Sequence, residues 1–296
     1  MKYTSLLLSF SILMLTVFGQ KPVKVIEIKD AMTKGTNSGM FTDIHQAELK
    51  DVQKEWEKLI KDGSKSKIED DNGEISIQAA EIDMIHSSPI NVYSRLQGIE
   101  NGVRLVAFFE IGDEFISSKG DERKYDQAVK FVRKFSVDMY RAAVEEEVKE
   151  EEKVMKDLKS DLKKLENEKE KLVKLIENNK KGIGKANSDI DQNEYDQKVK
   201  EAEIENQIVV VERLDGAIED QQKEAEKLLK KLRGEKEKLE KQNKKYHENI
   251  NKMEGEIEQA EREIDTNADD QRKKNKEIDQ QKDTVDDVQD KLRRIK

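Results

Sequence analysis

The sequence predicts an α+β protein: a small antiparallel-sheet N-terminal domain followed by a long α-helical coiled coil, built as a rod or a hairpin, with an internal duplication of about 74 residues. Three observations support this prediction. Apolar residues alternate around two Asn-Gly pairs within the first 120 residues, as in antiparallel hairpins. From residue 121 onward, apolar residues recur at spacings of three and four. Charged residues make up 41% of the chain and only two residues are proline, which is typical of coiled coils rather than large enzymes.

The chain opens on an apolar stretch from Leu6 to Phe18, preceded by Lys2. This stretch is shorter than the roughly 20 residues that a membrane-spanning helix needs. Val17 and Gly19 occupy the −3 and −1 positions that a signal peptidase reads. We therefore predict a signal peptide over residues 1–19, cleaved after Gly19, and a periplasmic or secreted protein. An uncut anchor is the alternative.

The composition indicates which classes of partner to expect. Lys and Arg number 56 against 65 Asp and Glu, so the formal net charge is −9. Duplex binding depends on neutralising phosphates, so we expect no nucleic-acid partner. The chain has no cysteine, and His45, His86 and His247 lack the spacing of a ligand set. We expect no metal, no cofactor and, after signal cleavage, no membrane contact.

The predicted α+β domain covers residues 20–120. Its first strand runs from Val23 to Lys29 and leads into a loop that carries Gly, Ser and Asn. A helix then begins at Asp43, a good N-cap with Gln46 three residues on, and ends at Gly63. Its apolar residues recur at helical spacing: Leu49, Val52, Trp56, Leu59 and Ile60. One face of this helix is therefore expected to be buried.

Two hairpins follow, at Asn72-Gly73 and Asn101-Gly102. Apolar residues alternate after each turn: Ile75, Ile77 and Ala79, then Val103, Leu105, Ala107, Phe109 and Ile111. This pattern predicts an antiparallel meander with the helix packed on one face.

We find no residues in this domain that predict catalysis. The segment His86-Ser-Ser-Pro89 places an imidazole beside two hydroxyls, but adjacent residues on a strand or turn point apart. The larger aromatic residues Trp56, Tyr93, Phe108 and Phe109 are interpreted as core, with a ligand pocket or docking face as the alternative. We predict a non-enzymatic protein with no catalytic residues.

Three segments, followed by a long charged helix, carry a resemblance: "EWEKLIKD" from Glu55, "AEIDMIHSSPINVYSRL" from Ala80 and "FFEIGDEFISS" from Phe108. Together they resemble a group of exported Bacteroidetes proteins with a small α+β head and a coiled-coil tail. The resemblance implies this architecture over nearly the whole chain. It assigns neither an activity nor functional residues.

Residues 121–296 are predicted to form the helical coiled-coil region. The helix starting near Tyr125 is expected to pack first on the α+β domain, through Ala128, Val132, Phe135, Met139 and Ala142. Beyond it, one heptad position holds Met155, Leu162, Ile176, Ile183 and Ile190, and the position three residues later holds Leu158, Leu165, Leu172 and Ala186. Such a stripe needs a second helix, from the same chain or another.

The tail repeats itself at an offset of 74, in copies over about 150–218 and 224–292. Identical pairs include Leu165 and Leu239, Ile176 and Ile250, Ala186 and Ala260, Asn193 and Asn267, and Gln207 and Gln281. Since 74 is ten heptads plus four residues, we expect a stutter that locally unwinds the coiled coil.

Both copies contain Asn-x-x-Asp-Gln, at Asn193–Gln197 and Asn267–Gln271. We interpret it as a register-fixing polar segment, with the tip of a helical hairpin as the alternative. Asp215-Gly216 is a second candidate bend.

Other tail motifs depart from their templates. The segment Lys181–Ala186 lacks residues that a phosphate loop needs, and the series Asp189, Asp191 and Asn193 lacks the glycine and glutamate of a calcium loop. Two acidic clusters, Glu145–Glu147 and Glu150–Glu152, are interpreted as a solvated face with ion pairs to Lys149, Lys153 and Lys156. A strip that binds cations or a basic protein is the alternative.

The sequence thus predicts an exported structural or interaction protein, whose head domain is presented on a coiled-coil stalk that oligomerises or spaces it. Its partner is a protein or itself, through a coiled-coil oligomer or an intramolecular hairpin, and no small molecule is identified. A periplasmic holdase-type chaperone and small-ligand binding by the N-terminal domain are the alternatives.

Overall fold

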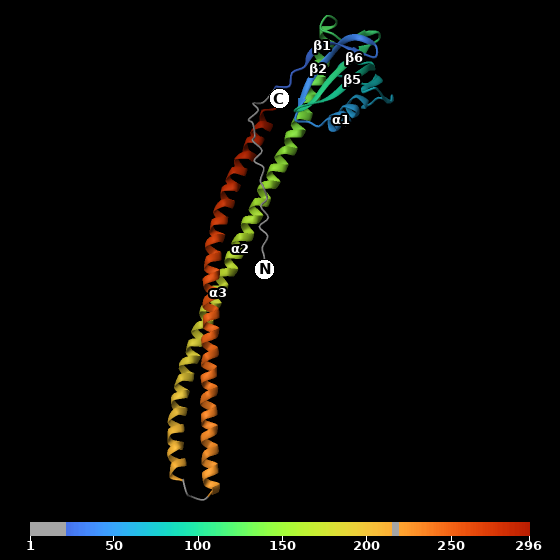
Figure 1. Cartoon of the computed structure of the whole chain (residues 1–296). Coiled ribbons are helices and arrows are strands. Elements are labelled where there is room, and N and C mark those ends of the chain that lie inside the picture. Colours follow the sequence, from blue (N-terminus) through green and yellow to red (C-terminus); the bar gives the residue numbers. More distant parts are fainter. Residues whose placement is uncertain (1–21, 215–218) are drawn as a thin grey trace. The chain divides into compact units, whose positions relative to one another are not determined.

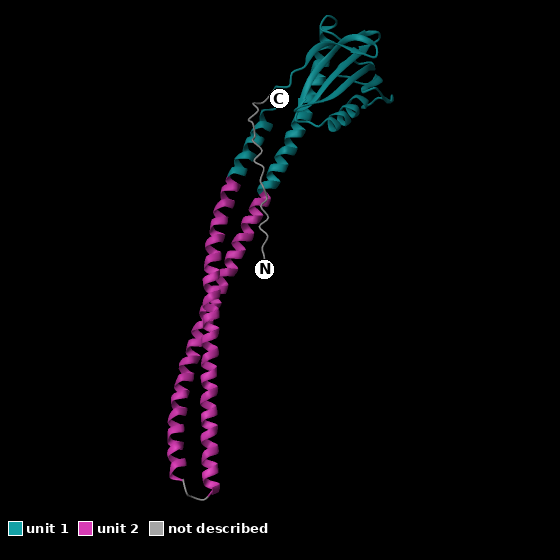
Figure 2. Cartoon of the chain, viewed as in Figure 1, with its two compact units in different colours: residues 1–155, 280–296 teal, residues 156–279 magenta. Residues whose placement is uncertain are grey.

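The computed structural model describes residues 22–214 and 219–296 (Figure 1). The chain divides into two compact units: residues 1–155 with 280–296 form unit 1, and residues 156–279 form unit 2 (Figure 2). The predicted cleavage site after Gly19 and the candidate bend at Asp215-Gly216 lie outside the described residues.

Unit 1 contains a seven-stranded sheet in which every pairing is antiparallel. Its strands are β1 (Ile26–Met32), β2 (Gly35–His45), β3 (Ile68–Asp71), β4 (Glu74–Ala80), β5 (Ile90–Ile99), β6 (Gly102–Ile111) and β7 (Glu114–Phe115). Their order is β1-β2-β6-β5-β4-β3, and β7 pairs with β6 off this path. The predicted α+β class is confirmed, and the sheet ends before residue 120.

The prediction of a loop after Lys29 is wrong. Strand β1 continues to Met32, and after a turn at Thr33 and Lys34 the chain forms β2, which pairs with β1 on one side and β6 on the other. Its Gly, Thr, Asn and Ser residues include several poor strand formers, so the composition resembled a loop. Gly39 has a packing reason, because a Cβ there would lie 2.6 Å from the Phe108 ring.

The predicted helix start at Asp43 is also wrong. Asp43 lies in β2, where its carboxylate pairs with Arg104 of β6 at 2.8 Å. Helix α1 (Leu49–Lys61) begins after Glu48, which makes no side-chain cap bond. Sheet pairing satisfies the backbone through His45, so the capping pattern at Asp43 is overridden.

Both Asn-Gly hairpins are confirmed, but the glycine has a different role in each. Asn72 and Gly73 both take positive φ, at 53° and 84°, as a two-residue hairpin turn requires. In the second hairpin the turn residues are Glu100 and Asn101, and Gly102 already belongs to β6. A Cβ on Gly102 would meet the Ile44 carbonyl oxygen at 2.0 Å, so close approach by β2 demands glycine there.

One face of the sheet packs on α1 and on the first turns of α2 (Glu122–Arg213). Trp56 of α1 is fully buried among Phe131, Phe135 and the sheet, and its Nε1 donates to Ser94 Oγ at 2.7 Å. The predicted contacts of α2 are confirmed except for Ala142, which is exposed. Ala143 packs in its place, because it follows Met139 by four residues and so lies one turn further along the same face.

The last turns of α3 (Glu219–Arg294) also belong to unit 1. Val288 and the fully buried Ile295, which follows α3, pack in one cluster with Tyr140 and Val144 of α2 and with Val23. Lys291 pairs with Glu147 at 2.8 Å. The acidic cluster over residues 145–152 is therefore not wholly a solvated face, because it also supplies partners to α3.

Unit 2 consists of the C-terminal part of α2 and most of α3, which run antiparallel and side by side (Figure 1). The coiled-coil region is thus a helical hairpin, and the rod alternative is wrong. Among the described residues, no helix is sufficiently long and apolar to cross a membrane.

We predict that Ser94→Ala lowers the free energy of unfolding of the head domain by about 1–3 kcal/mol, because it leaves the buried Trp56 indole N–H without its acceptor. Trp56 is the only tryptophan in the chain, so its fluorescence in a urea titration reports this transition. Ser88→Ala, at an exposed serine, serves as the control. Equal unfolding midpoints for the two variants would contradict the assigned role of Ser94.

Candidate interaction site

His86 and the segment Lys181–Ala186, the candidates for catalysis and nucleotide binding, make contacts within the fold. His86 Nδ1 accepts a hydrogen bond from the Ser88 backbone N–H at 3.1 Å, within an exposed turn. The segment Lys181–Ala186 lies inside α2, and a Cβ on its Gly182 would meet Met253 Sδ at 2.7 Å. Within residues 22–214 and 219–296, no group of three His, Cys, Asp or Glu could hold a metal ion.

The second face of the head sheet carries a buried polar cluster. Glu110 is 4% exposed and accepts hydrogen bonds from Lys34 Nζ at 2.8 Å, Asn91 Nδ2 at 2.8 Å and Tyr93 Oη at 3.1 Å. Burial acts most strongly on the pKa of Glu110 and raises it. The three hydrogen bonds together outweigh burial and hold the pKa below its ordinary value. The same Glu110, followed by Tyr93, raises the pKa of Lys34.

This cluster fastens the β1–β2 turn to distant strands. Thr33 hydrogen-bonds through its N–H and its hydroxyl to the buried Glu74 of β4, and Asp30 of β1 pairs with Arg95 of β5. These bonds connect the β1–β2 turn and β1 to strands β4, β5 and β6. An apolar cluster of Met32, Tyr93, Val106 and Phe108 is buried on this face. The aromatic residues Trp56, Tyr93, Phe108 and Phe109 are all buried, in two separate clusters, as the core interpretation required.

The hairpin of unit 2 covers the predicted heptad stripe, most of whose residues are half-buried. We call this stripe the seam: the residues of α2 and α3 at alternating spacings of three and four that face the other helix. Ala186, Ile190 and Ile250 form its best-buried cluster, with Ile183, Tyr246 and Met253 packed around them. The seam is therefore satisfied within one chain.

Buried amides fix the register of the two helices. Asn193 Nδ2 donates to the Leu239 carbonyl oxygen at 3.2 Å, and Asn267 Nδ2 donates to the Leu165 carbonyl oxygen at 3.0 Å. Asn193 and Asn267 are both 6% exposed. Because Asn267 and Leu239 are the copies of Asn193 and Leu165, the two bonds are one interaction made twice, about a pseudo-twofold axis.

Other amides follow the same rule. Gln207 Nε2 donates to the Ala225 carbonyl oxygen at 3.1 Å, and in unit 1 its copy Gln281 donates to the Glu151 carbonyl oxygen at 3.1 Å. Asn179 Nδ2 reaches the carbonyl oxygen of its own copy, Met253, at 3.5 Å. Asn179 and Met253 therefore lie at the axis, where each copy meets the other at the same position.

The structure corrects two expectations about the repeat. Asn-x-x-Asp-Gln is not the tip of a hairpin, since Asn193 and Asn267 lie inside α2 and α3 with their side chains at the seam. Nor does a stutter unwind the coiled coil. The first copy lies in α2 and the second in α3, so no single helix has to accommodate the change of heptad phase.

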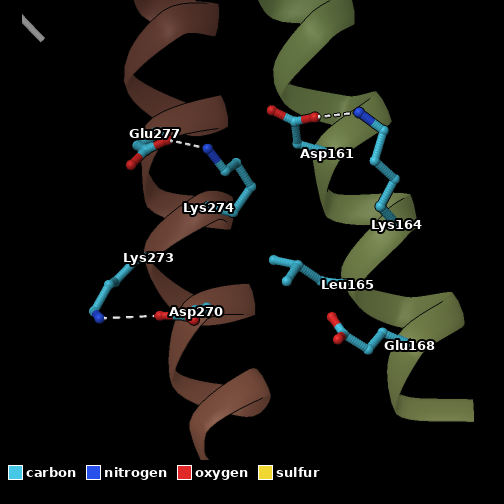
Figure 3. Close-up of a pocket in the computed structure, with 8 residues that line it drawn as sticks. All are labelled: Asp161, Lys164, Leu165, Glu168, Asp270, Lys273, Lys274 and Glu277. Carbon is cyan, nitrogen blue, oxygen red and sulfur yellow. Dashed lines mark hydrogen bonds and ion pairs between the residues drawn. The ribbon is translucent and has the colours of Figure 1, made fainter. Parts of the chain in front are cut away.

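Two shallow grooves flank the seam, each of about 420 Å³. The Leu165 groove is lined by Asp161, Lys164, Leu165, Glu168, Asp270, Lys273, Lys274 and Glu277 (Figure 3). The Leu239 groove is lined by Glu235, Lys238, Leu239, Gln242, Asp196, Val199, Lys200 and Glu203. Position by position, the second set is the copy of the first.

The linings differ in charge at two positions, Glu168 against Gln242 and Lys273 against Val199, and only the second places an apolar side chain in the groove. In the Leu165 groove the charged side chains pair along their own helices, as Lys273 does with Asp270 at 3.1 Å and Lys274 with Glu277 at 2.8 Å (Figure 3). Where Lys273 lines that groove, the Leu239 groove has Val199, which is 40% exposed. The Leu239 groove and the surface around Val199 are the candidate interaction site. We did not predict this site from the sequence, although aligning the two copies outside the seam would have found it.

No family model matches the chain, and a search of curated proteins finds no match. The resemblance to exported Bacteroidetes proteins therefore stays a prediction.

We predict that Asn193→Leu combined with Asn267→Leu stabilises the hairpin by about 1–2 kcal/mol per site, through added apolar burial, while loosening its register. Thermal unfolding followed by circular dichroism measures the first effect. An unchanged or lower melting temperature would contradict it.

Engineered cysteines measure the loosening of the register, because the chain has none of its own. A pair at Ala186 and Tyr246, which pack in one cluster, should cross-link with or without the two leucine substitutions. Leu239 lies one heptad before Tyr246 on α3, so a pair at Ala186 and Leu239 meets only when the helices slip by a heptad. This second pair should cross-link only in the double-leucine background. Cross-linking restricted to the first pair in both backgrounds would show that the amides do not set the register.

We also predict that acid weakens the head domain through Glu110. A carboxyl group whose folded-state pKa lies below its ordinary value of 4.5 contributes its full stability above that value, and the contribution is lost as the pH falls through the folded pKa. The unfolding free energy should therefore drop more steeply between about pH 6 and pH 3 in the unaltered protein than in Glu110→Gln. Tryptophan fluorescence in urea titrations at each pH measures the difference. Parallel curves would contradict the role given to Glu110.

Proposed function

We propose that this protein is an exported, non-enzymatic structural or interaction protein, in which a helical hairpin acts as a self-contained arm that spaces the α+β head domain from a partner. One observation carries the proposal: the hairpin closes its seam within a single chain and fixes its register with buried amides. An arm of this kind needs no second chain to fold. The export of the protein rests on the predicted signal peptide over residues 1–19.

The duplication supports a spacing role on physical grounds. An antiparallel hairpin gains length only when both of its helices gain opposing turns, because every added layer needs a partner across the seam. Here each copy supplies one helix, and seam residues of one copy lie opposite those of the other. Duplicating a single segment thus lengthens both helices together, and every added layer keeps a partner across the seam.

The two alternatives receive less support from the surface. A holdase needs a cavity lined by apolar side chains, whereas the grooves of unit 2 are lined mainly by Lys, Asp and Glu. Small-ligand binding by the head has little support, because the clusters on both sheet faces are buried and the open hollow of about 470 Å³ at α1 is lined mainly by lysine. Suppression of aggregation of a denatured outer-membrane protein would favour the first alternative, and stabilisation of the head by a metabolite would favour the second.

Light scattering on the chain from Gln20 onward tests the proposal. We predict the mass of one chain at micromolar concentration, because the two helices already cover each other's seam residues. A mass of two or more chains would contradict a self-contained arm.

Paired deletions test the spacing design. Removing residues 172–178 together with 254–260 takes opposing heptads out of both helices, so the remaining layers keep their partners. The arm should shorten by about 10 Å, at 1.5 Å per residue, and melt as one cooperative unit in circular dichroism. Removing residues 172–178 alone shifts Asn193 away from Leu239 and should lower the melting temperature by several degrees. Equal melting of the two variants would show that register does not matter.

A further inference from the structure

A second apolar stripe runs along the outer face of α2, away from the seam. Tyr195, Val199, Ala202 and Val209 follow one another at spacings of four, three and seven, and Val210 lies beside them. Tyr195 is 64% exposed, and the three valines are each at least 40% exposed. We call these five residues the outer stripe. They repeat at the helical period, so they line one face of about four turns.

Exposed apolar residues are distributed unequally in the described part of unit 2. Large apolar side chains that are exposed there are Val173, Leu175, Tyr195, Val199, Val209 and Val210 on α2, and Leu228 on α3. Single exposed apolar residues need no explanation, but four of these gather on one face of the last turns of α2.

The repeat provides an internal comparison. The two copies are identical at many seam positions, such as Leu165 and Leu239 or Asn193 and Asn267, and differ at every position of the outer stripe. The counterparts of Tyr195, Val199, Ala202, Val209 and Val210 in the second copy are Asp269, Lys273, Lys276, Asp283 and Thr284. A helix of the same phase thus accepts charged or polar residues at all five positions. Folding of the hairpin does not require the outer stripe.

The flanks of the outer stripe are acidic. Asp196 and Glu203 border it on one side, and Glu205 and Glu212 border it on the other, beside Lys198. From Glu194 to Arg213, six acidic residues outnumber three basic ones. Glu203 also pairs with Lys200 of the seam at 2.7 Å, which holds its carboxylate beside the Leu239 groove.

We propose that the outer stripe of α2 binds an amphipathic helix of another protein, with apolar residues along its contact face and Lys or Arg on both flanks. The apolar face of that helix packs on Tyr195, Val199 and Val209. Its cations lie beside Asp196, Glu203, Glu205 and Glu212. This inference rests on the proposed function, since it names the class of partner that the arm engages.

Charge decides between this occupant and two others. A second copy of the same stripe would bring acidic flanks against acidic flanks, which is unfavourable in a helix pair. An anionic lipid surface would be repelled by the same carboxylates. A basic helix gains from them instead, because charges beside a helix seam select the partner.

The Leu239 groove strengthens the fit. Val199 belongs both to the outer stripe and to this groove, whose lining includes Leu239. An apolar side chain of the partner helix has room there, in a space of about 420 Å³. In the Leu165 groove the counterpart of Val199 is Lys273, which pairs with Asp270. The Leu165 groove therefore offers a cation where the Leu239 groove offers an apolar wall.

A synthetic probe tests the inference on the chain from Gln20 onward. The probe is a fluorescein-labelled helix of four heptads with Leu along its seam and Lys on both flanks. Two control probes accompany it: one with Glu in place of every Lys, and one with the same composition in scrambled order. Fluorescence anisotropy should show binding of the Lys probe and at least tenfold weaker binding of both controls.

Two variants exchange residues between the copies, so each introduced residue already occurs at the equivalent position of the other helix. The triple variant Tyr195→Asp, Val199→Lys, Val209→Asp imports the second copy's residues and should weaken binding of the Lys probe at least tenfold, with an unchanged circular dichroism spectrum. The reverse variant Asp269→Tyr, Lys273→Val, Asp283→Val should raise the stoichiometry from one probe per chain toward two.

Three results would overturn the inference: equal binding by the triple variant, equal affinity for the Glu probe, or absence of binding to every probe. A two-chain mass in light scattering that the triple variant reduces to one chain would also overturn it, in favour of a second copy. Absence of probe binding by a chain that still has the mass of one chain would leave the proposed arm intact. A multi-chain mass that the triple variant does not change would instead count against the arm.

Discussion

A helix that carries an apolar stripe in a field of Lys and Glu has to cover that stripe, and the whole C-terminal half of this protein depends on how it does so. The chain covers it with its own copy. Asn193 and Asn267 each reach across the seam to the backbone of a leucine, and the two leucines are themselves copies of each other. These bonds select one register among the several that a regular apolar stripe permits.

The polar residues of the seam bury hydrogen-bonding groups, and some of these groups have no partner. Gln271 Nε2 donates to Asn267 Oδ1 at 2.7 Å, so the second copy satisfies its amide pair. In the first copy, Asn193 Oδ1 and Gln197 Nε2 are buried without a partner. Because the two groups belong to residues one turn apart, a side-chain rotation that reproduces the second copy's geometry would join them. Register is thus secured at the expense of some apolar contact, as in other coiled coils with a polar layer.

The head domain and the hairpin solve the same problem in different ways. The sheet covers one face with α1 and α2, and its other face is fastened by Thr33, Lys34, Glu74 and Glu110. In both parts, buried polar groups hold elements that apolar packing alone would leave free to slide. The two copies have diverged on the outer surface of the helices, where neither the seam nor the head domain constrains the residues.

Much of the fold could be predicted from the sequence, because helical and strand periods are local properties. The heptad seam, the two hairpins and the burial of Trp56 follow from residue spacing alone. Strand β2 could not be predicted in the same way. Its Gly, Ser and Asn residues are explained by the ring of Phe108 and by pairing with β6, which lies far along the chain from β2. The start of α1 was predicted wrongly for the same reason, since the pairing of β2 overrides the capping pattern at Asp43.

The sequence by itself determined that the C-terminal half is a helical coiled coil copied at an offset of 74, because periodicity and internal identity need no knowledge of contacts. Only the tertiary structure decided that the copies pair with each other in one chain. A stripe states that a partner helix is needed, and any helix of matching period satisfies it. The choice of partner depends on which backbone carbonyl each buried amide reaches, and that distance exists only in the folded protein.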